Sequence, residues 1–96
     1  MTQSRQLAAI MFTDIVGYTA MMGEDESKAF QLLKKNRLLQ RPLIERFGGW
    51  WIKELGDGVL ASFATGTDAV LCASAIQQAC AGDPFLKLRI RPHPFR

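Results

Sequence analysis

Four short apolar runs and two longer helical patterns alternate along this chain, and their order restricts the folds open to it. The first run, residues 7–13 (LAAIMFT), is unbroken and is typical of a strand buried on both faces. The later segments are a helix after the acids at 24–26 that ends at 48–49, strands at 50–55 and 59–63, a helix after 65–68 that stops near 82–84, and a strand at 85–90. This order predicts a ferredoxin-like βαββαβ fold of the α+β class, with a four-stranded antiparallel sheet and two helices on one face.

That topology brings two carboxylates together. The first and third strands are expected to be central neighbours, and the first strand runs parallel to the second. Asp14 ends the first strand, and Asp57 lies in the tight turn between the second and third strands. We therefore expect both side chains at the same edge of the sheet, although they are far apart in the sequence.

Two carboxylates at one edge indicate a divalent cation, and Mg²⁺ suits such a pair together with water and substrate phosphates. If residues 15–19 lead directly into a helix, its free amides can hold phosphate oxygens. Each feature also has an ordinary structural explanation. Asp14 alone could cap a helix, Asp57 alone could be a turn residue, and Lys53 could be a solvated charge on the sheet.

Composition excludes several classes of protein. The chain has 96 residues, of which 48% are hydrophobic and 22% charged, so one globular domain is expected and disorder is not. A net charge of +3 is too weak to argue for a nucleic-acid partner. No apolar run approaches the roughly 20 residues that a membrane span needs. The spacing of Cys72 and Cys80 fits neither a zinc site nor a redox pair, which favours buried reduced thiols in a cytoplasmic protein.

Two motifs carry a family resemblance. Residues 9–19 (AIMFTDIVGYT) and 53–63 (KELGDGVLASF) resemble the catalytic domain of the class III nucleotidyl cyclases, which comprise adenylate and guanylate cyclases. Both motifs stand in the order and approximate spacing of that family, and the resemblance covers residues 7–90. It is far more specific than a single glycine motif, and the ferredoxin-like core of that family agrees with the fold predicted from the pattern.

The resemblance implies a two-metal active site. Asp14 and Asp57 are similar to the catalytic, metal-binding aspartates that hold two Mg²⁺ or Mn²⁺ ions, and Ile15 would add its backbone carbonyl. The amides around Gly17, Tyr18 and Thr19 would bind the substrate phosphates. Such a site converts ATP to cyclic AMP and pyrophosphate by in-line attack of the ribose 3′-hydroxyl.

Substrate choice and assembly also follow from the resemblance. Lys53 matches the position where cyclases that use ATP place a lysine to read adenine, so ATP is the expected substrate. In the family, the metal aspartates of one chain face the lysine of its partner. A homodimer, or a dimer with another cyclase domain, is therefore expected.

The resemblance ends before the chain does. Residues 91–96 (RPHPFR) replace a glycine-containing segment of the family and carry two prolines. We expect residues 1–90 to be the N-terminal half of a cyclase catalytic domain, and residues 91–96 to be an aberrant tail left by truncation. The downstream residues that stabilise the transition state are then missing, which predicts little or no turnover by this chain alone. The alternative is a catalytically dead cyclase-like module that dimerises with full-length cyclases and modulates them.

Overall fold

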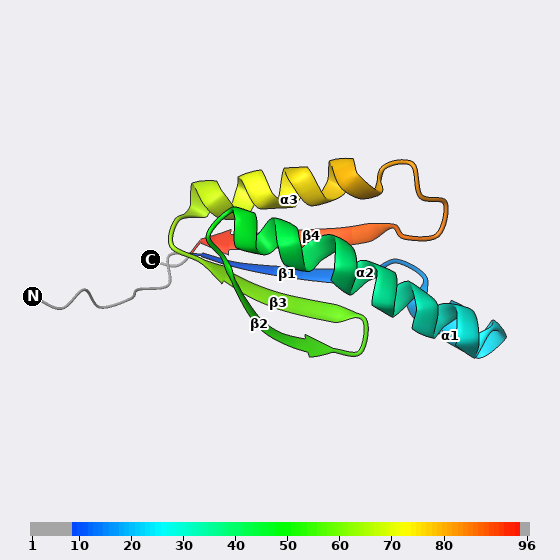
Figure 1. The fold of residues 1–96 in the computed structure, drawn as a ribbon. Coiled ribbons are helices and arrows are strands. Elements are labelled where there is room, and N and C mark those ends of the chain that lie inside the picture. Colours follow the sequence, from blue (N-terminus) through cyan, green and yellow to red (C-terminus); the bar gives the residue numbers. More distant parts are fainter. Residues whose placement is uncertain (1–8, 95–96) are drawn as a thin grey trace, which may run out of the picture.

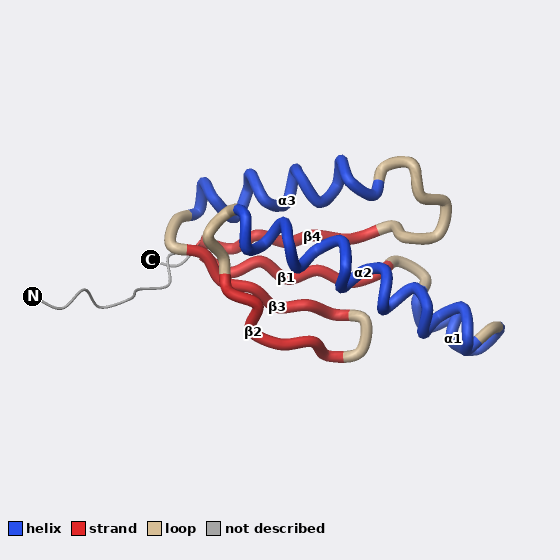
Figure 2. Tube along the Cα trace, viewed as in Figure 1, coloured by secondary structure: helices blue, strands red, loops and turns tan. Residues whose placement is uncertain are grey.

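The computed structural model describes residues 9–94 and has the predicted architecture. Its elements are, in chain order, β1 (Ala9–Ile15), α1 (Tyr18–Glu24), α2 (Glu26–Arg46), β2 (Trp50–Leu55), β3 (Gly58–Phe63), α3 (Gly66–Cys80) and β4 (Leu88–Pro94). All strand pairs are antiparallel in the order β2-β3-β1-β4, and α2 and α3 cover one face of the sheet (Figure 1). The ferredoxin-like prediction is confirmed. The short helix α1 is an addition that leads from the end of β1 into α2 (Figure 2).

Strand β1 alternates buried and half-buried side chains along its length. Ala9, Met11, Thr13 and Ile15 are buried, so they face the helices, whereas the residues between them face the open side of the sheet. Strand β3 is buried at almost every position because it lies beside β1 in the centre of the sheet. The core therefore sits between the two central strands and the two long helices.

Helix α2 buries a different stripe from the one its apolar residues suggest. Phe30, a large apolar residue near the start of the helix that would be expected to face the core, is 52% exposed. The buried positions are spaced by three or four residues and include two amides; they are Ala29, Leu32, Asn36, Gln40 and Ile44. Because the two amides are satisfied by hydrogen bonds, the helix can turn this partly polar stripe inward.

Helix α3 begins and ends close to the predicted bounds. The Thr65 hydroxyl accepts a hydrogen bond of 3.0 Å from the amide of Asp68, which caps the helix as expected. Leu71, although apolar, is 49% exposed on this helix. Cys72 is a buried free thiol, and burial raises its pKa to about 11. Cys80 is also a buried free thiol, so both cysteines are the buried reduced thiols that their spacing predicted.

Strand β4 corrects the predicted last strand. It covers Leu88–Pro94 and not residues 85–90, so the strand continues through two prolines. This is possible because β4 is an edge strand that pairs only with β1. Pro92 and Pro94 are two residues apart, so both backbone nitrogens lie on the same side of the strand, and the side away from β1 needs no donor. The division of the chain at residue 90 stays a prediction, and residues 95–96 of the proposed tail lie outside the described residues.

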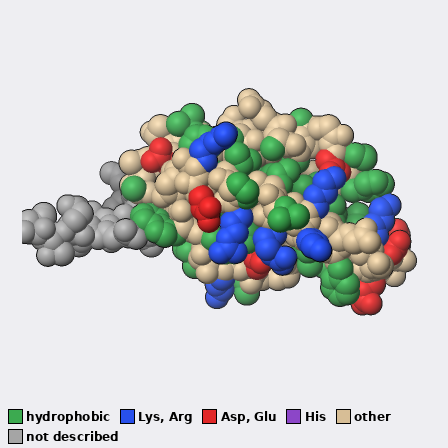
Figure 3. Space-filling view, viewed as in Figure 1, with side chains coloured by type: hydrophobic (Ala, Val, Ile, Leu, Met, Phe, Trp, Pro, Cys, Tyr) green, Lys and Arg blue, Asp and Glu red, His purple; other side chains and the backbone are tan. Residues whose placement is uncertain are grey.

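The surface over α2 carries many lysines and arginines (Figure 3). Several of them pair with acids, namely Lys35 with Asp83, Arg37 with Glu54 and Arg41 with Glu45. Trp51 packs beside Arg41, whose guanidinium lies 5.2 Å from the centre of the indole ring. Within residues 9–94, no helix is long and apolar enough to cross a lipid bilayer.

Candidate active site

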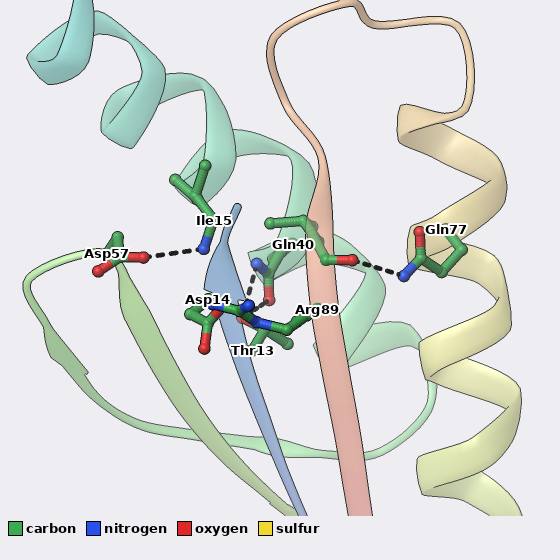
Figure 4. Close-up of polar contacts among 8 residues, drawn as sticks. Thr13, Asp14, Ile15, Gln40, Asp57, Gln77 and Arg89 are labelled. Atoms are coloured by element: carbon green, nitrogen blue, oxygen red, sulfur yellow. Dashed lines mark hydrogen bonds and ion pairs between the residues drawn. The ribbon is translucent and has the colours of Figure 1, made fainter. Parts of the chain in front are cut away.

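The turn between β2 and β3 is fastened to the end of β1. The backbone amide of Ile15 donates a hydrogen bond of 2.9 Å to Oδ2 of Asp57 (Figure 4). Ile15 follows Asp14 directly, and its own side chain is only 2% exposed, so the end of β1 is fixed by the core on one side. The two aspartates therefore meet at one edge of the sheet, as the topology predicted.

Asp14 lies on the open face of the sheet. It is opposite Arg89 in the register of β1 and β4, and Nε of Arg89 donates a hydrogen bond of 2.9 Å to its Oδ1 (Figure 4). The side chain of Asp14 is 26% exposed, so it is within reach of solvent and of a ligand. The predicted strand end at Asp14 is one residue short, because β1 continues to Ile15.

The donor atoms at this edge suit a hard divalent cation. One oxygen of each carboxylate is engaged, by Arg89 and by the amide of Ile15. Among the described residues, Oδ2 of Asp14 and Oδ1 of Asp57 have no hydrogen-bond partner. In that part of the chain, no group of three or more His, Cys, Asp or Glu side chains could enclose a metal ion. An open site with two carboxylates fits Mg²⁺ or Mn²⁺, which keep several waters and take further oxygens from a substrate.

The segment after β1 turns sharply into α1. Gly17 has a φ of 79°, a left-handed conformation that glycine adopts without steric cost, and it forms the N-cap of α1 without a capping side chain. The first amides of a helix have no partner within the helix, so those at the start of α1 are available to an acceptor. Tyr18 is half-buried and its hydroxyl lies 3.9 Å from Sδ of Met22, whereas Thr19 is exposed. The predicted helix start beside Asp14 is thus present.

Lys53 lies apart from this group of residues. It is an exposed residue of β2, and it pairs with Leu60 of β3, which in turn pairs with Phe12 of β1. Its neighbour Glu54 points to the helix side, where Arg37 holds both carboxylate oxygens at 2.9 and 3.2 Å. Alternation along the strand places Lys53 on the open face, the same face as Asp14 but two strands away.

Sequence reasoning missed a buried polar cluster beneath Asp14. Nε2 of Gln40 donates hydrogen bonds of 3.0 Å to the Thr13 hydroxyl and 2.7 Å to Oδ1 of Asn36. All three residues are at most 1% exposed, and they join α2 to the strand position next to Asp14. Two amides four residues apart inside a helical apolar pattern were the available signal. Arg89 was also missed, although its position opposite Asp14 follows from the register once the strand pairing is known.

Comparison with known proteins gives consistent matches. No protein-family model matches the chain. A protein of Rhizobium meliloti (strain 1021) named "Putative adenylate cyclase 3" is 42% identical over 78 residues, which is 80% of this chain and 13% of that protein. The crystal structure of an adenylate/guanylate cyclase/hydrolase from Silicibacter pomeroyi is 34% identical, with a TM-score of 0.79 over 93% of this chain and 56% of that one.

A more distant structure agrees in fold alone. The guanylate cyclase domain of RhGC from Catenaria anguillulae, solved in complex with GTP, has a TM-score of 0.81 and 18% identity, and the match covers 95% of this chain and 57% of that one. The chain therefore spans a small part of its curated relative and a little over half of each of these solved domains.

Proposed function

By sequence and by fold, the described chain belongs with the catalytic domains of the class III nucleotidyl cyclases, and on that premise we propose that it carries the metal and triphosphate site of an adenylate cyclase. The reaction is conversion of ATP to cyclic AMP and pyrophosphate. The observation that carries the proposal is the hydrogen bond from Ile15 to Asp57, which sets the Asp57 carboxylate beside Asp14 at an accessible edge of the sheet. Two adjacent, accessible carboxylates are what a Mg²⁺ site completed by water and substrate phosphates requires of the protein.

In this proposal, Asp14 and Asp57 hold two Mg²⁺ or Mn²⁺ ions through their carboxylates, and the carbonyl of Ile15 is a third protein ligand. The bound ions would activate the attacking 3′-hydroxyl and neutralise charge on the leaving pyrophosphate. The chain's own contribution is geometric. The core side chain of Ile15 and the turn bond to Asp57 fix the distance between the two carboxylates before a ligand arrives.

The start of α1 would bind the β- and γ-phosphates. Gly17 turns the chain so that its amide and those of Tyr18 and Thr19 follow Asp14 at once. Backbone donors at a helix start suit phosphate oxygens, because no side-chain entropy is lost when they bind. The metal carboxylates and the phosphate donors thus come from one continuous segment of β1 and α1.

Lys53 would read the adenine ring, from a second copy of the chain or from another cyclase domain. Within one chain it lies two strands from Asp14 and on the same open face, so a partner that covers this face could bring its own Lys53 to the aspartates. Because a guanylate cyclase domain of similar fold was solved with GTP, the fold alone does not select the base. In this proposal the choice of ATP rests on Lys53.

The test of the cyclase proposal is formation of cyclic AMP from ATP and Mn²⁺ by the purified chain. It is run at concentrations that force association, with Asp14→Ala as the control. Cyclic AMP above the control would support a complete reaction between two copies. ATP binding without product would restrict the proposal to a metal and triphosphate site that needs another cyclase domain. If the chain neither binds ATP nor forms cyclic AMP, the proposal is overturned.

A further inference from the structure

Arg89 holds a carboxylate that the proposed function assigns to a metal ion. Its Nε donates to Oδ1 of Asp14 at 2.9 Å, and the two residues are direct partners across β1 and β4. The side chain of Arg89 is 55% exposed, so the guanidinium can turn out into solvent without breaking any core packing. An ion pair that is this exposed to solvent contributes little stability, so a ligand of Asp14 can displace it.

A divalent cation and this guanidinium compete for the same carboxylate. Both are positive, and a cation on the free oxygen of Asp14 would lie within a few ångströms of Arg89. Repulsion at that distance is felt even at a solvated site. Although the metal would use the free oxygen, this repulsion weakens the ion pair with Arg89 when a metal binds, and the weakened pairing opposes metal binding.

We propose that Arg89 is the counter-ion of the Asp14 carboxylate, a positioning residue that holds Asp14 in the metal-free chain. Arg89 lowers the metal affinity, because its ion pair with Asp14 is weakened when a metal binds. This inference rests on the proposed function. It also ties metal loading to β4, because Arg89 belongs to that strand and pairs with Asp14 of β1. Loading the metal would release one of the links between β4 and β1.

The experiment is calorimetric titration of Mn²⁺ into the full chain without nucleotide. Arg89→Gln removes the competing charge, Arg89→Lys keeps it, and Arg91→Gln is the matched control. Arg91 is exposed on the same strand, and its variant has the same net charge, but it is opposite Phe12 and not Asp14. We expect Arg89→Gln to bind Mn²⁺ about 3- to 10-fold more tightly than the wild type, and the two other variants to stay within about twofold of it.

The outcomes separate this inference from the metal site itself. If neither the wild type nor Arg89→Gln binds Mn²⁺, the metal site and the inference both fail. If Mn²⁺ binds in an Asp14-dependent way but Arg89→Gln leaves its affinity unchanged or weaker, only the role of Arg89 is overturned. Equal tightening by Arg89→Gln and Arg91→Gln would mean a general charge effect and would also overturn it. As a second readout, Arg89→Gln should lower the melting temperature without metal and enlarge the rise that Mn²⁺ produces.

Discussion

The backbone amide of Ile15 donates a hydrogen bond of 2.9 Å to the carboxylate of Asp57, and this contact joins the end of β1 to the turn between β2 and β3. Strand β3 already pairs with β1, and β2 pairs with β3. The hydrogen bond to Asp57 adds a second connection between this hairpin and β1, at the site itself. Asp57 is positioned by the backbone of the very segment that carries Asp14. A ligand that needs both carboxylates therefore finds them already fixed relative to each other.

Gln40→Leu should destabilise the fold. The substitution keeps the side-chain volume roughly constant but leaves the buried hydroxyl of Thr13 and amide of Asn36 without Gln40. Leaving buried polar groups unsatisfied costs about 1–3 kcal/mol. Urea unfolding would measure the loss, with Gln31→Leu as the control because Gln31 is exposed on the same helix. Equal stability of the two variants would contradict the importance of the cluster.

Gly49→Ala should also destabilise the chain, for a steric reason. A Cβ at residue 49 would lie 2.5 Å from Cε2 of Phe63 and 2.9 Å from Cγ2 of Ile44, and both of those residues are fully buried. Overpacking of this kind costs about 1–3 kcal/mol. Gly66→Ala meets nothing within 4 Å and serves as the control in the same unfolding experiment. An unchanged midpoint for Gly49→Ala would show that the core yields more easily than its packing implies.

Acid should weaken a link between α2 and the loop before β4. Asp83 pairs with Lys35 and accepts hydrogen bonds from the amides of Leu86 and Phe85, and these contacts lower the pKa of Asp83 to about 2. Because the folded pKa lies below the unfolded value of about 3.9, the ionised form stabilises the fold above pH 4. That stabilisation is lost as the pH falls through 4 towards 2. Asp83→Asn should thus be less stable than the wild type at neutral pH, and the difference should shrink in acid. A difference that is constant from pH 7 to pH 2 would contradict this role.

Lys53→Glu should change the choice between nucleotides. An ammonium on β2 can donate to the acceptor atoms of adenine, whereas a carboxylate can accept from the donors of guanine. We expect the preference for ATP over GTP to fall or to reverse. It is measured as competition for Mn²⁺-dependent binding at the high chain concentrations that the proposed dimer requires. Lys87→Glu carries the same charge change on an exposed residue outside β2. If the preference is the same in both variants, Lys53 does not read the base.

Much of this molecule could be predicted from its sequence, because the element order and the strand pairing are local and topological properties. The meeting of Asp14 with Asp57 followed from strand direction alone. The buried stripe of α2 could not be read correctly, because the polar residues Asn36 and Gln40 are tolerated in the core only through the hydrogen bonds that Gln40 donates to Thr13 and to Asn36. The continuation of β4 through Pro92 was missed because the prolines were taken to end the strand, although the predicted topology places this strand at the edge of the sheet, where a missing donor is tolerated. The role of Arg89 needs the register, which no local pattern supplies.

The central claim is that Asp14 and Asp57 form one metal and triphosphate site, and binding of ATP to the purified chain with and without Mn²⁺ tests it most directly. The comparison includes Asp14→Asn, Asp57→Asn and the control Asp68→Asn, which makes the same charge change in the first turn of α3. We predict Mn²⁺-dependent binding that each site variant weakens by about tenfold or more, while Asp68→Asn binds like the wild type. Binding that is independent of Mn²⁺, or unchanged in both site variants, would contradict the account.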